Sequence, residues 1–331
     1  MTRTQKLGLC TWLPEDPVCL AEVNDNFSRL DDSGARALRQ AESSLLLLGG
    51  LMAAQAHQGG HAAYSDCIQV DAFSDMAQVA DYAGVYFLGK RAELLTSGLA
   101  DGTVLGNGSN SDLNASSVLR MTQTKQAWVK LFNFYPDAYG NLTTLKLQTM
   151  ATASASASAV VKLAIWDAQT QESLLETELG QITRKNSEEQ PVTFRAPLLL
   201  DPNRKYAMML WIESMPASAF TLTTLKFTIT PVVYQQGSVT LQARAIPAGC
   251  TRAEILLHAS TDAANALLRF GSGEFTALTA SQTLADRLPG GEECTFLRFG
   301  LDIPAGAQTV QLKLELPSTS CKLYDTALVL L

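Results

Sequence analysis

The first regular pattern along the chain is helical. Over residues 18–56, apolar or small side chains recur at steps of three and four, the spacing of one face of an α-helix. Because so long a helix cannot bury its stripe alone, the pattern predicts a parallel coiled coil of identical chains, or else a helix packed on its own domain. The residues predicted to carry the contact are Leu20, Val23, Phe27, Leu30, Leu45, Leu48 and Met52.

From residue 127 onward the period changes to two. Apolar residues alternate with polar ones in many short runs, for example over 310–316, and turn residues separate the runs. The continuous apolar run 206–212 predicts a central strand, with Trp211 in the core. Successive strands without long helices between them are typical of antiparallel β-sandwiches or jelly rolls.

These changes in pattern divide the chain. The predicted fold is mostly β: one N-terminal coiled-coil helix followed by two tandem antiparallel, jelly-roll-like β-sandwiches. The predicted segments are an N-terminal attachment strand (1–17), a trimerisation helix (18–56), a mixed strand and loop connector (57–126), a first sandwich of carbohydrate-binding type (127–234) and a second sandwich (235–331).

Composition and charge limit the classes of function that this protein can have. Of 331 residues, 47% are hydrophobic and 17% are charged, which predicts a folded core rather than disorder. The net charge of −7, without clusters of Lys and Arg, argues against a nucleic-acid partner. Residues 43–65 lack charge, but two Gly-Gly pairs and several polar residues argue against membrane insertion. The N-terminus has no apolar signal region, which predicts cytoplasmic synthesis, and six cysteines without a C-x-x-C pair predict free thiols.

Catalytic and metal-binding patterns are sparse. The chain has three histidines and neither a G-x-S-x-G motif nor a phosphate-binding glycine loop. His258 reads as a surface or edge residue of a strand, and paired carboxylates cannot be placed across a substrate by spacing alone. We therefore expect a protein that is not an enzyme and needs neither metal nor cofactor.

Aromatic residues are the better candidates for a binding surface, because an indole or phenol ring can stack on the apolar face of a sugar. Tyr135 and Tyr139 flank a predicted loop that also carries Asp137, and Trp128 begins the strand before it. These four residues are the predicted ligand-binding set. Ordinary packing is the competing explanation for each ring.

Two N-terminal segments carry a family resemblance. Residues 7–16 read LGLCTWLPED, and residues 23–31 read VNDNFSRLD. They resemble the start of tail appendage proteins from phages and prophages of Gram-positive bacteria, in which a short L-G-L…W strand precedes an N-x-N helix that begins a coiled coil. Residues 66–75, DCIQVDAFSD, are similar to the D-G-x-x-V-D-x-F-x-D stretch of the same proteins, with Cys67 where glycine is usual.

The resemblance implies a homotrimeric tail fibre or receptor-binding protein of the virion. Its N-terminus would attach to tail or baseplate proteins, its helix would trimerise, and its sandwiches would bind a host cell-surface glycan. Release by cell lysis would explain the absence of a signal peptide. Two other classes stay open: a purely structural baseplate, neck or spacer protein, and a hydrolase or depolymerase of surface polysaccharide.

Overall fold

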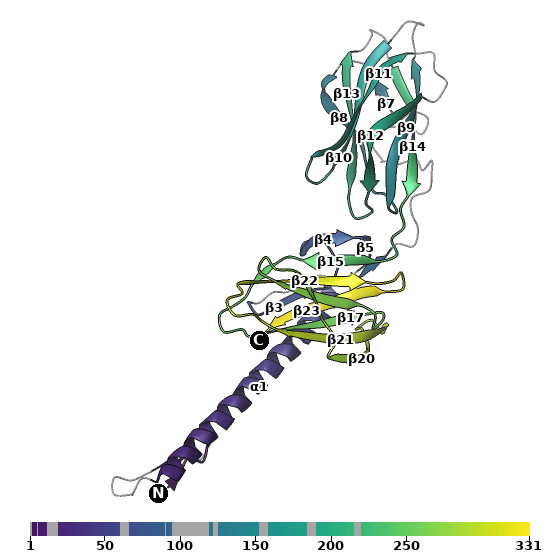
Figure 1. The fold of residues 1–331 in the computed structure, drawn as a ribbon. Helices are drawn as coiled ribbons and strands as arrows, with labels where there is room; N and C mark the ends of the chain where they lie inside the picture. The colour runs from purple at the N-terminus through teal and green to yellow at the C-terminus, as the bar shows by residue number, and fades with distance from the viewer. Residues whose placement is uncertain are drawn as a thin grey trace. The chain divides into compact units, whose positions relative to one another are not determined.

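The structure is a computed structural model, which describes residues 2–4, 6–11, 19–59, 66–89, 91–94, 119–121, 125–151, 158–183, 190–214 and 220–331. The described chain is mostly β-strand in antiparallel sheets, with one helix near the N-terminus (Figure 1). It divides into two compact units. The helical unit is Met1–Ala83, Phe87–Glu93 and Ser238–Leu331, and the inserted unit is Gly84–Tyr86 and Leu94–Gly237.

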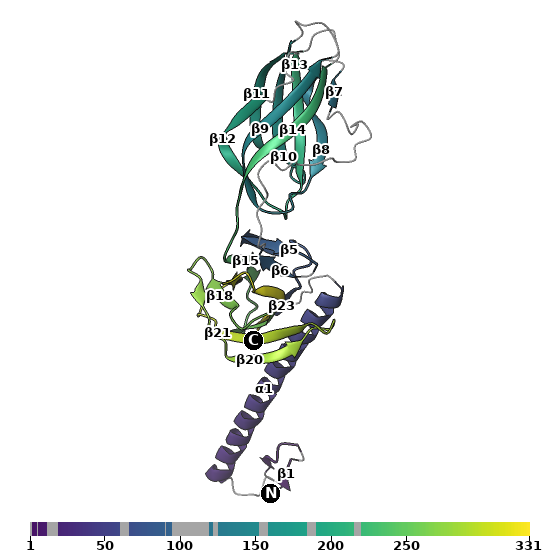
Figure 2. The same ribbon diagram turned by 90° about the vertical axis from the view of Figure 1, so that its right-hand side faces the viewer.

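The helical unit contains two main sheets. One has the strand order β20-β21-β17-β23-β6-β5, with β3 paired to β23, and the other has the order β19-β18-β22-β15-β4, with β16 paired to β22 (Figure 2). The strands are β3 (Ile68–Asp71), β4 (Val79–Ala83), β5 (Val85–Phe87), β6 (Ala92–Leu94), β15 (Gly237–Leu241), β16 (Arg244–Ala245), β17 (Arg252–Ala259), β18 (Asn265–Phe270), β19 (Thr276–Ala277), β20 (Gln282–Arg287), β21 (Glu293–Asp302), β22 (Thr309–Leu316) and β23 (Lys322–Leu330).

Alternation along these strands supplies the core. Leu312 and Leu314 on β22 and Ile255 and Leu257 on β17 are completely buried. Each buried leucine or isoleucine stabilises the fold by roughly 1.5–3 kcal/mol relative to an exposed one. The predicted period of two over 310–316 is therefore present in the structure.

Helix α1 (Leu20–Gly59) packs its C-terminal end on the sheet of its own unit. Ala53 and Ala56 lie in one buried cluster with Val70 of β3 and with Ala327 and Val329 of β23. These small side chains bring the helix close to the strands. The helix therefore covers the face of this sheet that lies opposite the core.

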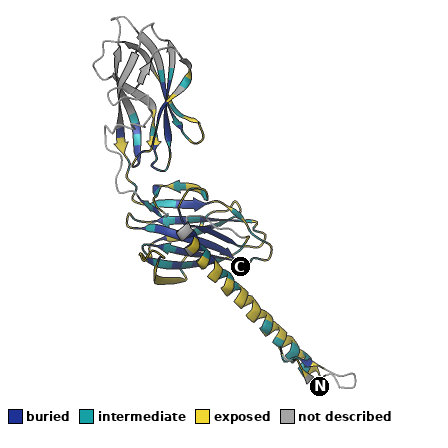
Figure 3. Cartoon of the chain, turned by 180° about the vertical axis from the view of Figure 1, so that it is seen from behind, coloured by how far each residue is buried: buried dark blue, intermediate teal, exposed yellow. Residues whose placement is uncertain are grey.

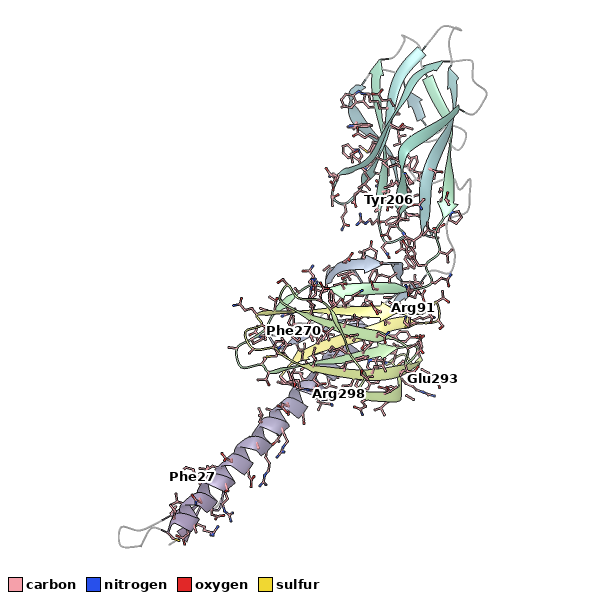
Figure 4. The ribbon with its side chains drawn as sticks, viewed as in Figure 1. Phe27, Arg91, Tyr206, Phe270, Glu293 and Arg298 are labelled. Atoms are coloured by element: carbon pink, nitrogen blue, oxygen red, sulfur yellow. The ribbon has the colours of Figure 1, made fainter. Side chains whose placement is uncertain are left out.

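The predicted contact residues of the helix divide into two groups. Leu45 and Met52 pack against the cluster below the helix, and Val23 is half-buried. Leu20, Phe27, Leu30 and Leu48 are exposed, with 75%, 63%, 45% and 46% of their surface accessible. Figure 3 shows exposed residues along most of the helix, and Figure 4 shows Phe27 near its N-terminal end. Some of the helix residues predicted to contact a partner helix thus pack against strands of their own chain.

The N-terminal strands are tied to the helix by one asparagine. Strand β1 (Thr2–Arg3) pairs with β2 (Cys10–Thr11). The backbone N–H of Cys10 donates to Oδ1 of Asn26 at 2.6 Å, and Nδ2 of Asn26 donates to the Cys10 carbonyl at 2.9 Å. Asn26 is the second asparagine of the N-x-N sequence. Residues 12–18 of the predicted attachment segment lie outside the described residues.

The connector predicted over 57–126 differs in the structure. Strands β3 and β6 pair with β23, and β4 pairs with β15, so residues 68–71, 79–83 and 92–93 complete the sheets of the helical unit. The first predicted sandwich is accordingly inserted into the second rather than placed in tandem before it. The cause is long-range pairing: each of these short strands needs a partner more than 150 residues away, which local pattern does not specify.

The inserted unit has two four-stranded sheets. Their orders are β11-β10-β13-β8 and β12-β9-β14-β7. Leu142, Leu200 and Ile229 from the second sheet are fully buried, as are Leu163 and Met208 from the first. The strands are β7 (Leu119–Met121), β8 (Lys125–Phe134), β9 (Gly140–Ala151), β10 (Ser158–Asp167), β11 (Ser173–Thr183), β12 (Gln190–Leu200), β13 (Tyr206–Ser214) and β14 (Phe220–Pro231).

Candidate functional site

Three tryptophans form a cluster on the first sheet of the inserted unit. Trp128 on β8 lies between Trp166 on β10 and Trp211 on β13, with ring centroids 6.1 and 5.7 Å away and edge-to-face geometry. Pairing within the sheet explains their proximity, because β13 hydrogen-bonds to both β10 and β8. All three indoles are only partly buried.

The rings rest on a floor of smaller side chains. Ala164, Ala207 and Met209 form a buried cluster, against which Trp128 and Trp166 pack. On β10 and β13 these positions alternate with core residues such as Leu163 and Met208, so the cluster lies on the opposite face of the sheet. Small residues at Ala164 and Ala207 leave room for the indoles above them. The sheet therefore carries a second apolar surface outside its core.

A cavity of about 320 Å³ opens beside this cluster, within the size range of small-molecule sites. Apolar and polar side chains both line it, which is the usual composition of a ligand pocket. Strands β8, β10 and β13 and the turn after β10 contribute them. The lining residues are Trp128, Lys130, Asn133, Trp166, Asp167, Ala168, Gln171, Lys205, Ala207 and Met209.

The turn between β10 and β11 is fixed by Asp167. Its Oδ1 accepts the backbone N–H groups of Gln169 and Thr170 at 2.8 and 3.0 Å, and its Oδ2 lies 3.9 Å from Nη1 of Arg204. Gln171, which closes the turn, has a φ of 61°. A non-glycine residue in this left-handed conformation costs about 1–2 kcal/mol, and such strain concentrates at functional sites.

Two polar atoms of the lining have no hydrogen-bond partner among the described residues. They are Nε1 of Trp166, a donor, and Oδ1 of Asn133, an acceptor, and both are enclosed by protein. Enclosed polar groups are almost always paired with protein, water or ligand.

The structure places one of the four predicted binding residues in this cavity, namely Trp128. Tyr135 is 62% exposed, and Nζ of Lys205, a lining residue, lies 5.5 Å from the centre of its ring. Asp137 is exposed and does not line the cavity. Tyr139 is buried and donates its hydroxyl to the Val85 carbonyl at 2.6 Å, so it serves packing.

The prediction for Trp211 differs from the structure. We expected it in the core, but it stands on the tryptophan face beside Trp128. In β13 the outward residues Ala207 and Met209 are as apolar as the inward residues. The sequence of β13 therefore lacks the apolar and polar alternation that would place Trp211 on the outer face. Lys130 and Gln171 were also missed. The signal available was the spacing of Trp128 and Lys130, which puts both on one face of a strand.

A second polar cluster lies on the helical unit. Nδ1 of His258 lies 2.7 Å from Oδ1 of buried Asp325, and its Nε2 lies 3.3 Å from Oδ2 of Asp286 on β20. Burial lowers the pKa of His258, but the two carboxylates outweigh it and the net shift is upward. Burial raises the pKa of the nearby Cys294 thiol to about 11, so this thiol stays protonated at neutral pH. His258 therefore lies between two carboxylates on a central strand and is not a simple edge histidine.

Cysteines, metal ligands and membrane spans can also be compared with expectation. All six cysteines are free. Within the described segments, no group of three His, Cys, Asp or Glu residues is placed to hold a metal ion, and no helix is long and apolar enough to cross a membrane. The side chains of the other two histidines in the sequence, His57 and His61, lie outside the described residues.

Comparison with known proteins gave no family. No family model matches the chain, and no curated protein matches it. Among solved structures, the chain is similar to a protein of the T13 IBDV viral particle, with 8% identity, a TM-score of 0.23 and coverage of 66% of this chain and 38% of the other. It is also similar to the N-terminal CBM22-1–CBM22-2 tandem domain of Paenibacillus barcinonensis Xyn10C, with 12% identity, a TM-score of 0.19 and coverage of 82% and 93%.

Proposed function

We propose that this chain is a glycan-binding attachment protein of a phage tail, which self-associates through its helix and binds a host surface glycan with its inserted unit. The observation that carries the proposal is the tryptophan face. Trp128, Trp166 and Trp211 are partly exposed on the outside of a sheet, beside a cavity with polar lining. An exposed cluster of aromatic rings on the outer face of a sheet is typical of a binding surface.

The lining favours binding of a sugar. A sugar ring offers an apolar face to an indole and hydroxyl groups to polar partners. Trp128 and Trp166 supply the aromatic surface, while Asn133 and Gln171 supply amides that both donate and accept hydrogen bonds. The one carboxylate among the described lining residues, Asp167, is engaged with its own turn. The arrangement therefore supports recognition of the glycan more than cleavage of it.

The helix supports self-association. Its C-terminal end packs on the sheet through Ala53 and Ala56, yet Leu47, Leu48 and Leu51 on the other side are 66%, 46% and 59% exposed. Nearer the N-terminus, Leu20 and Phe27 are also exposed. So much exposed apolar surface on one helix is typical of an interface. We assign it to parallel packing of three copies, which would display three inserted units together.

The tail location rests on the N-terminal resemblance. The double hydrogen bond from Asn26 to Cys10 makes the strand and the start of the helix one structural element. An element fixed to the helix in this way suits attachment to tail or baseplate proteins. This part of the proposal predicts that antibody against residues 2–11 labels the virion tail.

The glycan part is tested by screening the purified chain on an array of bacterial surface glycans. We expect binding that Trp128→Ala reduces at least about fivefold, because a stacked aromatic ring contributes about 1 kcal/mol or more. Tyr139→Phe is the matched control, since it removes a hydroxyl from a buried ring that does not line the cavity. A folded chain that binds no glycan, or binds equally after Trp128→Ala, would disprove the assignment.

The self-association part needs its own measurement. Light scattering should give about three times 35.6 kDa for the chain. Leu48→Asp with Leu51→Asp should lower that mass without unfolding the sheets, because both side chains point away from the cluster under the helix. A monomeric wild-type chain would reject the role of the helix while leaving glycan binding to be judged separately.

A further inference from the structure

The cavity beside the tryptophan face has a local excess of positive charge, although the chain as a whole carries −7. Lys130 on β8 and Lys205 at the start of β13 both line it. Among the described residues neither lysine forms an ion pair; Lys205 instead lies over the ring of Tyr135. Three lysines elsewhere are paired, namely Lys162 with Glu178, Lys313 with Glu315 and Lys322 with Glu93.

The one carboxylate among the described lining residues, Asp167, offsets only part of the charge of these lysines. Oδ1 of Asp167 accepts two backbone N–H groups of its turn, and its Oδ2 faces Arg204. Arg204 adds a third cation next to the cavity, though it is held between Asp167 and Asp201. Three cations, Lys130, Lys205 and Arg204, face two carboxylates, Asp167 and Asp201, so a net positive charge remains beside the apolar surface. Such a site favours an anion over a neutral ligand.

From these contacts we infer that the site is selective for an acidic saccharide, one whose ring carries a carboxylate, phosphate or sulfate group. The inference rests on the proposed glycan binding and names the class of glycan. The sugar ring packs on Trp128 and Trp166, and its acidic group lies between the ammonium groups of Lys130 and Lys205.

The strength of the preference follows from general magnitudes. A hydrogen bond to a charged group contributes roughly 1.5–3 kcal/mol, or about tenfold to a hundredfold in affinity. Lys130 is exposed and Lys205 is half-buried, so salt screens both pairs in part. We therefore expect about tenfold from each lysine at physiological salt, and less at high salt.

The experiment is calorimetric titration of the full chain with matched oligosaccharides. One has a uronic acid, a second has the same acid reduced to a hydroxymethyl group, and two more carry phosphate or sulfate at that position. We expect the carboxylate to bind at least tenfold more tightly than the reduced sugar, and the phosphate and sulfate arms show which acid is preferred. Lys130→Gln and Lys205→Gln should each remove about tenfold from acidic-sugar affinity and lower neutral-sugar affinity by a smaller factor. Lys313→Gln is the control for loss of charge.

The possible failures are distinguishable. If the neutral and acidic sugars bind equally and both lysine variants behave as wild type, the acidic specificity is overturned and glycan binding stands. If no sugar binds and Trp128→Ala has no effect, the proposed function fails together with this inference. Salt gives a further check: raising NaCl from about 50 to about 500 mM should weaken acidic-sugar binding several-fold in wild type and hardly at all in the double lysine variant.

Discussion

Replacing Gly49 by alanine should detach the C-terminal end of α1 from its sheet. A methyl group at position 49 would lie 2.7 Å from Cγ2 of Val329, and 3.8 Å from atoms of Ala327 and Leu256. Real carbon atoms do not approach so closely, and Val329 is completely buried, so it cannot turn away into solvent. Overpacking of this kind costs about 1–3 kcal/mol.

The neighbouring glycine provides a matched control. A methyl group at position 50 would meet no atom of the described residues within 4 Å, although Gly50 lies in the same helix. Gly50→Ala should therefore stabilise the helix by about 0.5–1 kcal/mol, because alanine loses less backbone entropy on folding. Gly49→Ala gains the same stabilisation from helix propensity, but it is also destabilised by the overpacking against Val329. The difference between the two variants is consequently about 1–3 kcal/mol, with helix propensity cancelled.

The measurement is urea unfolding of each variant, combined with hydrogen exchange of the amides in residues 45–59. We expect Gly49→Ala to unfold at lower urea and to exchange faster over this segment. Gly50→Ala should do the reverse. Equal stability of the two variants would refute the docking of the helix on β3 and β23, and would favour a helix whose every face is used between chains.

Three further predictions concern buried charge and strain. Burial raises the pKa of Asp71 to about 6 from its ordinary 3.8, so its contribution to stability is full below about pH 4 and is lost as pH rises through 6. Asp71→Asn keeps an acceptor for the N–H of Phe73 and should add up to ~3 kcal/mol to the unfolding free energy at about pH 8, and little at about pH 4. A pH-independent difference would contradict this. Gln171→Gly should stabilise the chain by roughly 0.5 kcal/mol, since relief of the left-handed strain exceeds the entropy of glycine, and should weaken glycan binding through loss of the amide; unchanged affinity would remove Gln171 from the site. Because the pKa of His258 is raised, the stability that its charged form contributes is present below about pH 6.5 and is lost as pH rises further. His258→Gln should therefore make the unfolding free energy less dependent on pH above about 6.5. An unaltered pH profile would argue against the ion pairs.

Local pattern was enough to predict the helix and several of the strands, but not β11 or β20. The three-and-four spacing over 18–56 corresponds to α1, and the period of two over 310–316 corresponds to β22. Both patterns arise from side chains close together in sequence, and each reflects one face buried against something. The class of fold, mostly β with one N-terminal helix, follows from them.

Pairing between distant strands was not predictable in the same way. Residues 68–71 form a strand that pairs with residues 326–329. The pattern of four residues does not specify which distant strand they pair with. The same long-range pairing explains why the helix was assigned to an intermolecular seam. Leu45 and Met52 pack against a cluster that contains residues of β3 and β23. That cluster exists only when these two distant strands are paired.

The candidate site shows why an apolar run can conceal a binding face. In β13 the inward residues Met208 and Leu210 are buried between the sheets, and the outward residues Ala207 and Met209 are nearly as buried beneath Trp128 and Trp166. A strand that is apolar on both faces is ordinarily a central strand covered on both sides. Here no element of the described structure covers the outward face; the indoles themselves do. Trp128 and Trp166 thus bury the smaller side chains beneath them and expose the opposite faces of their rings. A sugar ring can stack on those exposed faces.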